Sequence, residues 1–150
     1  MDHLLYIAMS GAKENMNALG VRANNLANAN TTGFKADLEQ AIALDATALQ
    51  GSAYTSLGVL YYKVPGWPVG FGSDKKARKL LTKALELNPQ GIDPNYFYAE
   101  FLTEERDYKA AMRYLQIAKQ APARPERPLA DSGRQQEIAT LERKLAKKLK

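Results

Sequence analysis

The sequence repeats the pattern Ala-x3-Leu-x2-Ala, first in ARKLLTKA at residues 77–84 and again in AMRYLQIA at residues 111–118. The second copy follows the first at an offset of 34 residues at all three positions. Each copy is preceded by a segment with helical character, SLGVLYY at residues 56–62 and YAEFLTEE at residues 98–105. A repeat of this length with small residues at fixed places is typical of stacked helix-turn-helix units. The sequence therefore predicts two helical hairpins.

Small residues matter in such hairpins because antiparallel helices approach closely only where one side chain leaves room for the other. Gly58 and Ala77 take these crossing positions in the first hairpin, and Ala99 and Ala111 take them in the second. The remaining positions of the repeat signature supply apolar contacts or end a helix. They are Tyr54, Leu57, Tyr61, Leu81, Ala84 and Pro89 in the first hairpin, and Tyr98, Leu102, Tyr108, Leu115 and Ala118 in the second.

The flanking segments also read as helices. Apolar residues recur at helical spacing from Asp2 to about Asn28, a turn is expected over residues 28–33, and a second helix runs from Phe34 to about Ala48. A proline-rich linker leads into a last helix from about Asp131. Its narrow apolar stripe (Ile138, Leu141, Leu145 and Leu149) is expected to cap the repeats. The predicted fold is all-α, a stack of antiparallel helical hairpins with a C-terminal capping helix.

Composition excludes several classes of site. The chain has 150 residues, no cysteine and one histidine, His3, which excludes disulfides, Cys/His zinc sites and thiol nucleophiles. With no acid–base pair legible, we expect no catalytic residues, no metal, no cofactor and no enzymatic activity. The net charge is +5, and its excess falls in residues 119–150. Nucleic-acid binding is not favoured, because a solvated capping helix explains the positive charge of residues 119–150 better than contact with nucleic acid or anionic lipid does.

The N-terminal segment, residues 1–40, resembles the N-terminus of flagellar basal-body rod proteins, most of all the FlgF family of the proximal rod. The signature is carried by Asn25, Leu26, Ala27, Asn28, Thr31, Gly33, Phe34 and Lys35. The resemblance implies a self-association helix that packs in an assembled rod. The β-rich body and second terminal helix of that family have no counterpart in the rest of this sequence.

Residues 41–123 resemble tetratricopeptide repeat (TPR) proteins, and loosely the T-component of TRAP transporters. Three segments follow: a rod-like hairpin at 1–40, repeats at 41–123, and a linker with a capping helix at 124–150. We expect them to share one helical core. Because the residues before and after Gln40 resemble two unrelated families, the sequence suggests a natural fusion or an engineered chimera in which the rod hairpin replaces a missing repeat.

The first helix of each repeat is expected to line a groove for a protein or peptide, which includes a second copy of this chain. Its lining is Thr55, Val59, Tyr62, Tyr96, Glu100 and Thr103. The alternatives are that these residues form ordinary exposed surface, or that the N-terminal or C-terminal helix covers this face. In the loop before residue 74, Trp67 and Phe71 are expected either to contact a partner or to cap their own core.

These features favour a non-enzymatic interaction scaffold of the TPR type. A rod component that self-associates through residues 1–35 is the first alternative, and a periplasmic solute- or peptide-binding transport component is the second. The sequence shows no signal peptide and no transmembrane segment, so a cytoplasmic location is expected, although the parent families act in the periplasm or the flagellar basal body.

Overall fold

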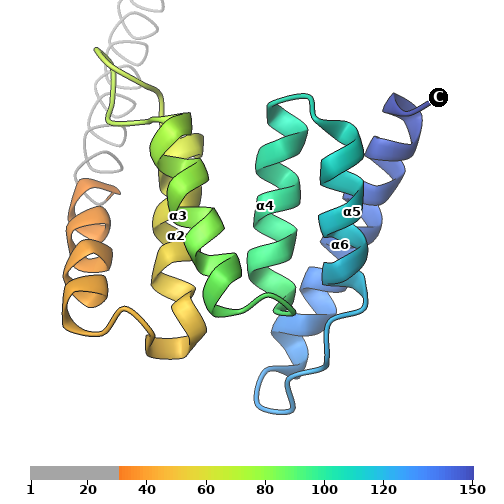
Figure 1. Cartoon of the computed structure of the whole chain (residues 1–150), viewed down its shortest axis with the longest axis horizontal. Helices are drawn as coiled ribbons and strands as arrows, with labels where there is room; N and C mark the ends of the chain where they lie inside the picture. The colour runs from red at the N-terminus through yellow and green to blue at the C-terminus, as the bar shows by residue number, and fades with distance from the viewer. Residues whose placement is uncertain (1–30) are drawn as a thin grey trace, which may run out of the picture. The chain divides into compact units, whose positions relative to one another are not determined.

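The computed structural model describes residues 31–150, and the chain forms two compact units, Met1–Asp37 and Leu38–Lys150. Residues 31–44 are helical. Then follow η1 (Ala48–Gly51), α2 (Ser52–Lys63), α3 (Asp74–Leu87), α4 (Ile92–Glu104), α5 (Tyr108–Lys119) and α6 (Pro128–Lys148) (Figure 1). Every regular element in this part of the chain is a helix, apart from one isolated β-bridge between Gly66 and Gly72. The predicted all-α class is confirmed for the described residues.

The first hairpin pairs α2 with α3. At the crossing, a Cβ atom on Gly58 would lie 2.8 Å from Cγ of Leu81, which is closer than real contacts allow. Leu81 is fully buried there, together with Ala77 and Ala84 on the same face of α3. The helices therefore cross where the sequence places its small residues.

The second hairpin pairs α4 with α5 in the same way. Ala99 of α4 and Ala111 of α5 are both completely buried, and Leu115 fills the space beside them. Asp107 caps α5 by accepting a hydrogen bond from the Ala110 backbone N–H at 3.1 Å. Ser73 does the same for α3, with the Lys76 N–H as donor at 3.3 Å.

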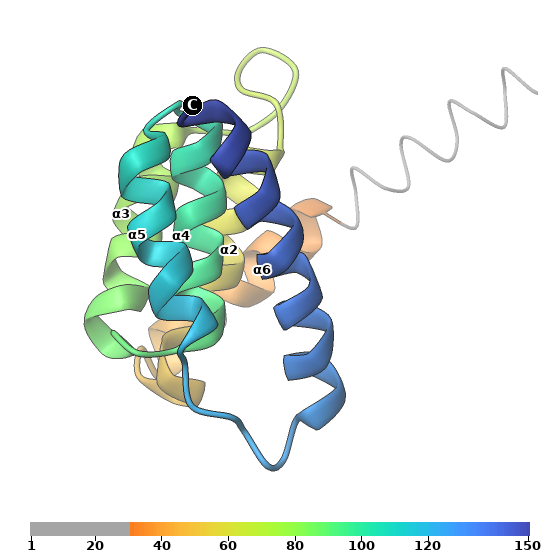
Figure 2. The same ribbon diagram turned by 90° about the vertical axis from the view of Figure 1, so that its right-hand side faces the viewer.

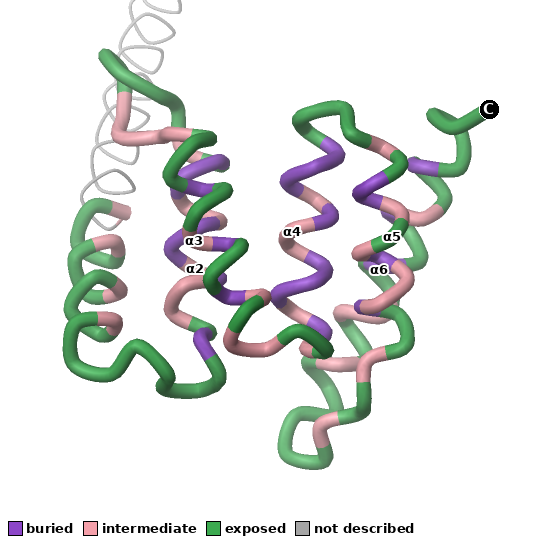
Figure 3. Tube along the Cα trace, in the orientation of Figure 1, coloured by how far each residue is buried: buried purple, intermediate pink, exposed green. Residues whose placement is uncertain are grey.

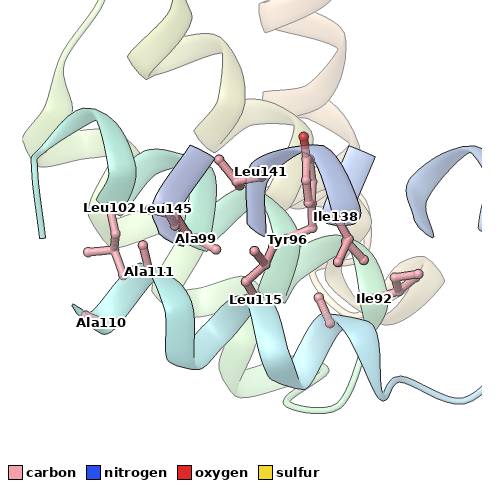
Figure 4. Close-up of a cluster of buried hydrophobic side chains, with 11 residues drawn as sticks. Ile92, Tyr96, Ala99, Leu102, Ala110, Ala111, Leu115, Ile138, Leu141 and Leu145 are labelled. Carbon is pink, nitrogen blue, oxygen red and sulfur yellow. The ribbon is translucent and has the colours of Figure 1, made fainter. Parts of the chain in front are cut away.

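Helix α6 packs against both α4 and α5 (Figure 2). Ile138, Leu141 and Leu145 of its apolar stripe join the core of the second hairpin, as Figure 4 shows. Leu149, the last member of the predicted stripe, is 41% exposed instead, because α6 ends at Lys148. Proline occupies the first position of α6, so the helix begins at Pro128, three residues before the expected start.

Burial follows the repeat signature closely (Figure 3). Tyr54, Tyr98 and Tyr108 are half-buried and Pro89 is exposed. The other signature residues are buried: Leu57, Gly58, Tyr61, Ala77, Leu81, Ala84, Ala99, Leu102, Ala111, Leu115 and Ala118. This packing explains the pattern physically, while assignment to the TPR family stays a prediction.

The segment before α2 differs from expectation in two places. Residues 31–33 are helical, so the predicted turn does not include them, and Gly33 has open space around it and no positive φ. The helix also ends at residue 44 and not near Ala48, because the Asp45 carboxylate accepts hydrogen bonds from the Thr47 N–H and hydroxyl, both at 2.8 Å. Asn25, Leu26, Ala27 and Asn28, with the predicted first helix, lie outside the described residues.

The two helical glycines Gly58 and Gly133 should respond to alanine with opposite signs. We expect Gly58→Ala to destabilise the fold by about 1 kcal/mol net, because crowding Leu81 outweighs the gain in helix propensity. Gly133→Ala should stabilise it by about 0.5–1 kcal/mol, since nothing lies within 4 Å of the added methyl group. Urea unfolding followed by circular dichroism measures both values. A stabilising Gly58→Ala would contradict the close crossing.

Candidate functional site

The residues predicted to line a groove lie on α2 and α4, and most of them are buried. Only Val59 and Glu100 keep part of their surface exposed. The exposed fractions of the other four are 5% for Thr55, 9% for Tyr62, 8% for Tyr96 and 6% for Thr103. The Thr103 hydroxyl donates to the Ala99 carbonyl oxygen at 2.7 Å inside its own helix. Tyr62, Tyr96 and Thr103 therefore pack inside the protein and form no open lining, and Thr55 shows only a small part of its surface.

A polar network joins α2 to α4 at this face. The Tyr62 hydroxyl donates a hydrogen bond to the Glu100 carboxylate. Lys63 Nζ lies 3.2 Å from Glu100 and 2.8 Å from Glu104. Burial, followed by the hydrogen bond to Glu100, raises the pKa of Tyr62 well above its ordinary value, so the phenol keeps its proton. The face is closed by these contacts.

Helix α6 covers the adjoining part of α4. The Arg134 guanidinium lies 4.7 Å from the ring centre of Tyr96 and 4.4 Å from that of Phe97. Its Nε also donates to Asp93 at 2.8 Å. At Tyr96, therefore, the structure agrees with the alternative in which the C-terminal helix covers the predicted groove.

An open concavity of about 620 Å³ lies nearer the N-terminal ends of α2 and α4. Thr55 is the one predicted groove residue in its lining. The rest of the lining comes mainly from the η1–α2 junction, the start of α4, the linker before α6 and the first part of α6, and includes Ser52, Ser56, Asp93, Phe97, Arg124, Glu126, Arg127 and Arg134. We call this site the arginine groove. On α2, Ser56 and Ser52 lie one and two helical turns before the predicted groove residue Val59. On α4, Phe97 and Asp93 lie one and two turns before Glu100. Extending the predicted groove face by helical spacing toward the start of each helix would therefore have included these four residues.

Acidic residues neutralise two of the three arginines. Arg124 donates to Asp93 at 2.7 Å and through Nε to Asp131 at 2.8 Å, and its backbone N–H also reaches Asp131. The hydrogen bond with Asp131 raises the pKa of Arg124, and the Arg124 guanidinium lowers the pKa of Asp131. No acidic side chain among residues 31–150 forms an ion pair with Arg127. The groove thus offers one arginine without an ion pair to a described residue, beside the Glu126 carboxylate, hydroxyls and an aromatic ring.

The loop between α2 and α3 separates its two candidate aromatic residues. Phe71 is half-buried and packs edge-on against Tyr61, with ring centres 5.7 Å apart. Trp67 is 90% exposed. Phe71 therefore caps its own core, whereas Trp67 faces solvent.

A more apolar depression of about 660 Å³ borders the first hairpin. Tyr54, Leu57, Tyr61 and Leu80 form its apolar wall, and lysines of α3 line the rim. Leu38 and Ile42 pack near it, against the core of the first hairpin. No helix among residues 31–150 has the length and apolar character to cross a bilayer. The same residues hold no cluster of three His, Cys, Asp or Glu side chains that could bind a metal ion.

Acid should weaken the contact between the linker and α6. Because Arg124 lowers the pKa of Asp131 in the folded state, the ionised carboxylate stabilises the fold above its unfolded pKa of about 3.9. That stabilisation disappears as the pH falls through the lower folded pKa. We expect the difference in unfolding free energy between the wild type and Asp131→Asn to be largest near neutral pH and to shrink below about pH 4.

Urea unfolding at a series of pH values measures this difference. Glu126→Gln is the matched control, because Glu126 is an exposed acid of the same linker that forms none of the ion pairs described above. A pH-independent effect of Asp131→Asn would contradict the electrostatic role.

Comparison with known proteins places a similarity at the N-terminus. A family model described as flagella basal body rod protein matches residues 5–35. The flagellar basal-body rod protein FlgF of Escherichia coli (strain K12) and that of Salmonella typhimurium (strain LT2) are each 39% identical over 66 residues. The match covers 44% of this chain and 25% of either relative.

The chain therefore spans about a quarter of the length of the curated relatives it matches. A stretch of 66 residues is longer than the forty predicted, so the similarity continues past residue 40. The N-terminal part of this chain is thus similar in sequence to FlgF, a flagellar basal-body rod protein.

Proposed function

We propose that this chain is a non-enzymatic structural component that self-associates through its rod-like N-terminal segment and carries a helical scaffold behind it. The observation that carries the proposal is the match of residues 5–35 to the flagellar basal body rod family. A rod-type sequence retained over residues 5–35, within a longer stretch of 66 residues similar to FlgF, supports retention of the contact function of that segment. By this proposal the chain acts at a flagellar basal body.

Phe34 is the described residue best placed to contribute to such a contact. It belongs to the rod signature, it lies in the first compact unit, and 51% of its surface is exposed although the side chain is large and apolar. Aromatic side chains of this kind dominate the binding energy of many protein interfaces.

The test replaces Phe34 in the full chain. We expect the wild type to self-associate in a concentration-dependent manner, and Phe34→Ser to weaken association at least about tenfold, because a buried aromatic contact contributes well over 1 kcal/mol. Sedimentation equilibrium measures the association constant. Leu44→Ser is the matched control, since Leu44 is 80% exposed and lies outside the rod signature.

Deleting residues 1–35 separates the two roles. Self-association should disappear while residues 36–150 keep their helical circular dichroism signal. A wild-type chain that remains monomeric at all concentrations would refute the rod-type role.

The arginine groove supports a second, compatible function as a binding site for an acidic peptide. Arg127 is the arginine of this concavity that forms no ion pair within the described part of the chain, and Phe97 and Ser56 supply an apolar and a polar group in the same lining. A carboxylate side chain on an extended peptide fits this combination of groups. This is the scaffold role expected of the helical hairpins.

Selection of displayed peptides on the full chain tests this function. Bound sequences should be enriched in Asp and Glu, and Arg127→Glu should weaken their binding at least about tenfold by repulsion. Lys83→Glu makes the same charge change on α3, outside the groove, and should have no effect. Peptides without acidic enrichment, or equal losses in the two variants, would contradict the assignment.

A further inference from the structure

The loop between α2 and α3 holds two apolar side chains in solvent. Trp67 is 90% exposed and Val69 is 80% exposed, and together they form what we call the loop tip. Isolated exposed apolar residues are ordinary, but an exposed tryptophan beside an exposed valine on one short loop is a small apolar surface without a partner in the described chain.

The backbone of this loop is held firmly by hydrogen bonds. The Gly70 N–H donates to the Gly66 carbonyl at 3.1 Å, the Gly72 N–H to Pro65 at 2.9 Å, and the Ser73 N–H to Tyr61 at 2.7 Å. A Cβ atom on Gly70 would lie 2.5 Å from the Pro65 carbonyl oxygen, so the chain folds back tightly on itself. With Phe71 packed on Tyr61, the loop presents its tip in a defined conformation, and binding needs little additional ordering.

A basic cluster occupies the C-terminal part of α6. Its members are all exposed, and no acidic residue of the described chain forms an ion pair with any of them. The cluster, which we call the basic end, consists of Arg143, Lys144, Lys147, Lys148 and Lys150. Its apolar neighbours Leu141 and Leu145 face the core, whereas Leu149, between Lys148 and Lys150, is partly exposed, so the basic end presents mainly charge.

The loop tip and the basic end lie at the same end of the second unit. Figure 1 and Figure 2 both show the α2–α3 loop extending beyond the ends of the helices on the side where α6 terminates. Figure 1 also shows that the α4–α5 hairpin separates the two features along the long axis of the view. A ligand that contacts both must therefore be extended.

Three acids between the two features are engaged, whereas Asp74, in the first turn of α3 after the loop, is exposed and forms no ion pair among residues 31–150. Glu104 pairs with Lys63, Glu105 pairs with Arg78, and Asp107 caps α5. The surface between the two features therefore does not repel an anionic partner, and exposed Lys109 adds a further cation to it.

We propose that this end of the protein docks on an anionic lipid bilayer, with the loop tip entering the interface and the basic end facing the lipid phosphates. A bilayer is extended, carries negative charge, and accepts tryptophan at the level of its headgroups. A nucleic acid would satisfy the cations but would leave Trp67 and Val69 without an apolar environment. The combination of a rigid apolar tip and a separate basic cluster therefore favours the membrane.

The full chain can be tested directly, because Trp67 is its single tryptophan and its emission reports on the loop tip. With vesicles of equal parts phosphatidylcholine and phosphatidylglycerol, we expect co-sedimentation and a blue shift of the emission. With pure phosphatidylcholine vesicles, or at high salt, both signals should be lost. Absence of binding to the anionic vesicles, or equal binding to the neutral ones, would overturn the proposal.

Variants identify the contributing groups. The double variant Lys147→Gln with Lys148→Gln should weaken vesicle partitioning about 30-fold. The control double variant, Lys83→Gln with Arg127→Gln, removes the same charge from side chains nearer the opposite end of the protein. It should change vesicle partitioning less than about twofold. Trp67→Ala should weaken co-sedimentation at least about tenfold, and Leu129→Ala, at a residue 88% exposed where α6 begins, should have no effect.

Circular dichroism verifies that each variant is folded. Equal losses in the two charge variants would refute docking through the basic end. Binding of duplex DNA without vesicle binding or a shift in Trp67 emission would assign the cations to a nucleic acid and refute the membrane proposal.

Discussion

Leu81 fills a space that exists only because residue 58 carries no side chain. This close approach sets the distance between α2 and α3, and the buried alanine pair Ala99 and Ala111 allows a close approach of α4 and α5. Once both hairpins are fixed, α4 has α2 on one side and α6 on the other. The polar network between α2 and α4, the arginine groove and the position of the capping helix α6 all follow from how closely these helices cross.

Helix α4 is where these contacts converge. Its Glu100 binds Tyr62 and Lys63 of α2, and its Asp93 accepts from Arg134 of α6 and from Arg124 of the linker. Ion pairs that link separate elements in this way fix relative orientation more than they add stability, because part of their energy offsets desolvation. The scaffold owes its stability to apolar packing and its groove to these polar contacts.

The helices and their crossing points could be predicted from the sequence because spacing and side-chain size determine both locally. The closure of the predicted groove could not be predicted from the sequence, because Tyr96 is covered by Arg134, which lies 38 residues further along the chain. The different exposure of Trp67 and Phe71 depends on a tight backbone turn that the composition of the loop does not specify. The early end of the helix at residue 44 depends on one Asp45 side chain that competes for backbone hydrogen bonds.

The internal pairing of Arg124 and Arg134 has an electrical consequence for α6. Because Asp93 and Asp131 pair with these arginines near the start of the helix, Arg127 is the one arginine there without an ion pair among the described residues, whereas five cations without such an ion pair lie near its end. The second unit therefore has a permanent dipole moment along α6, although its net charge is modest. In the field of any charged surface this moment exerts a torque, which turns the molecule toward one orientation before contact is made.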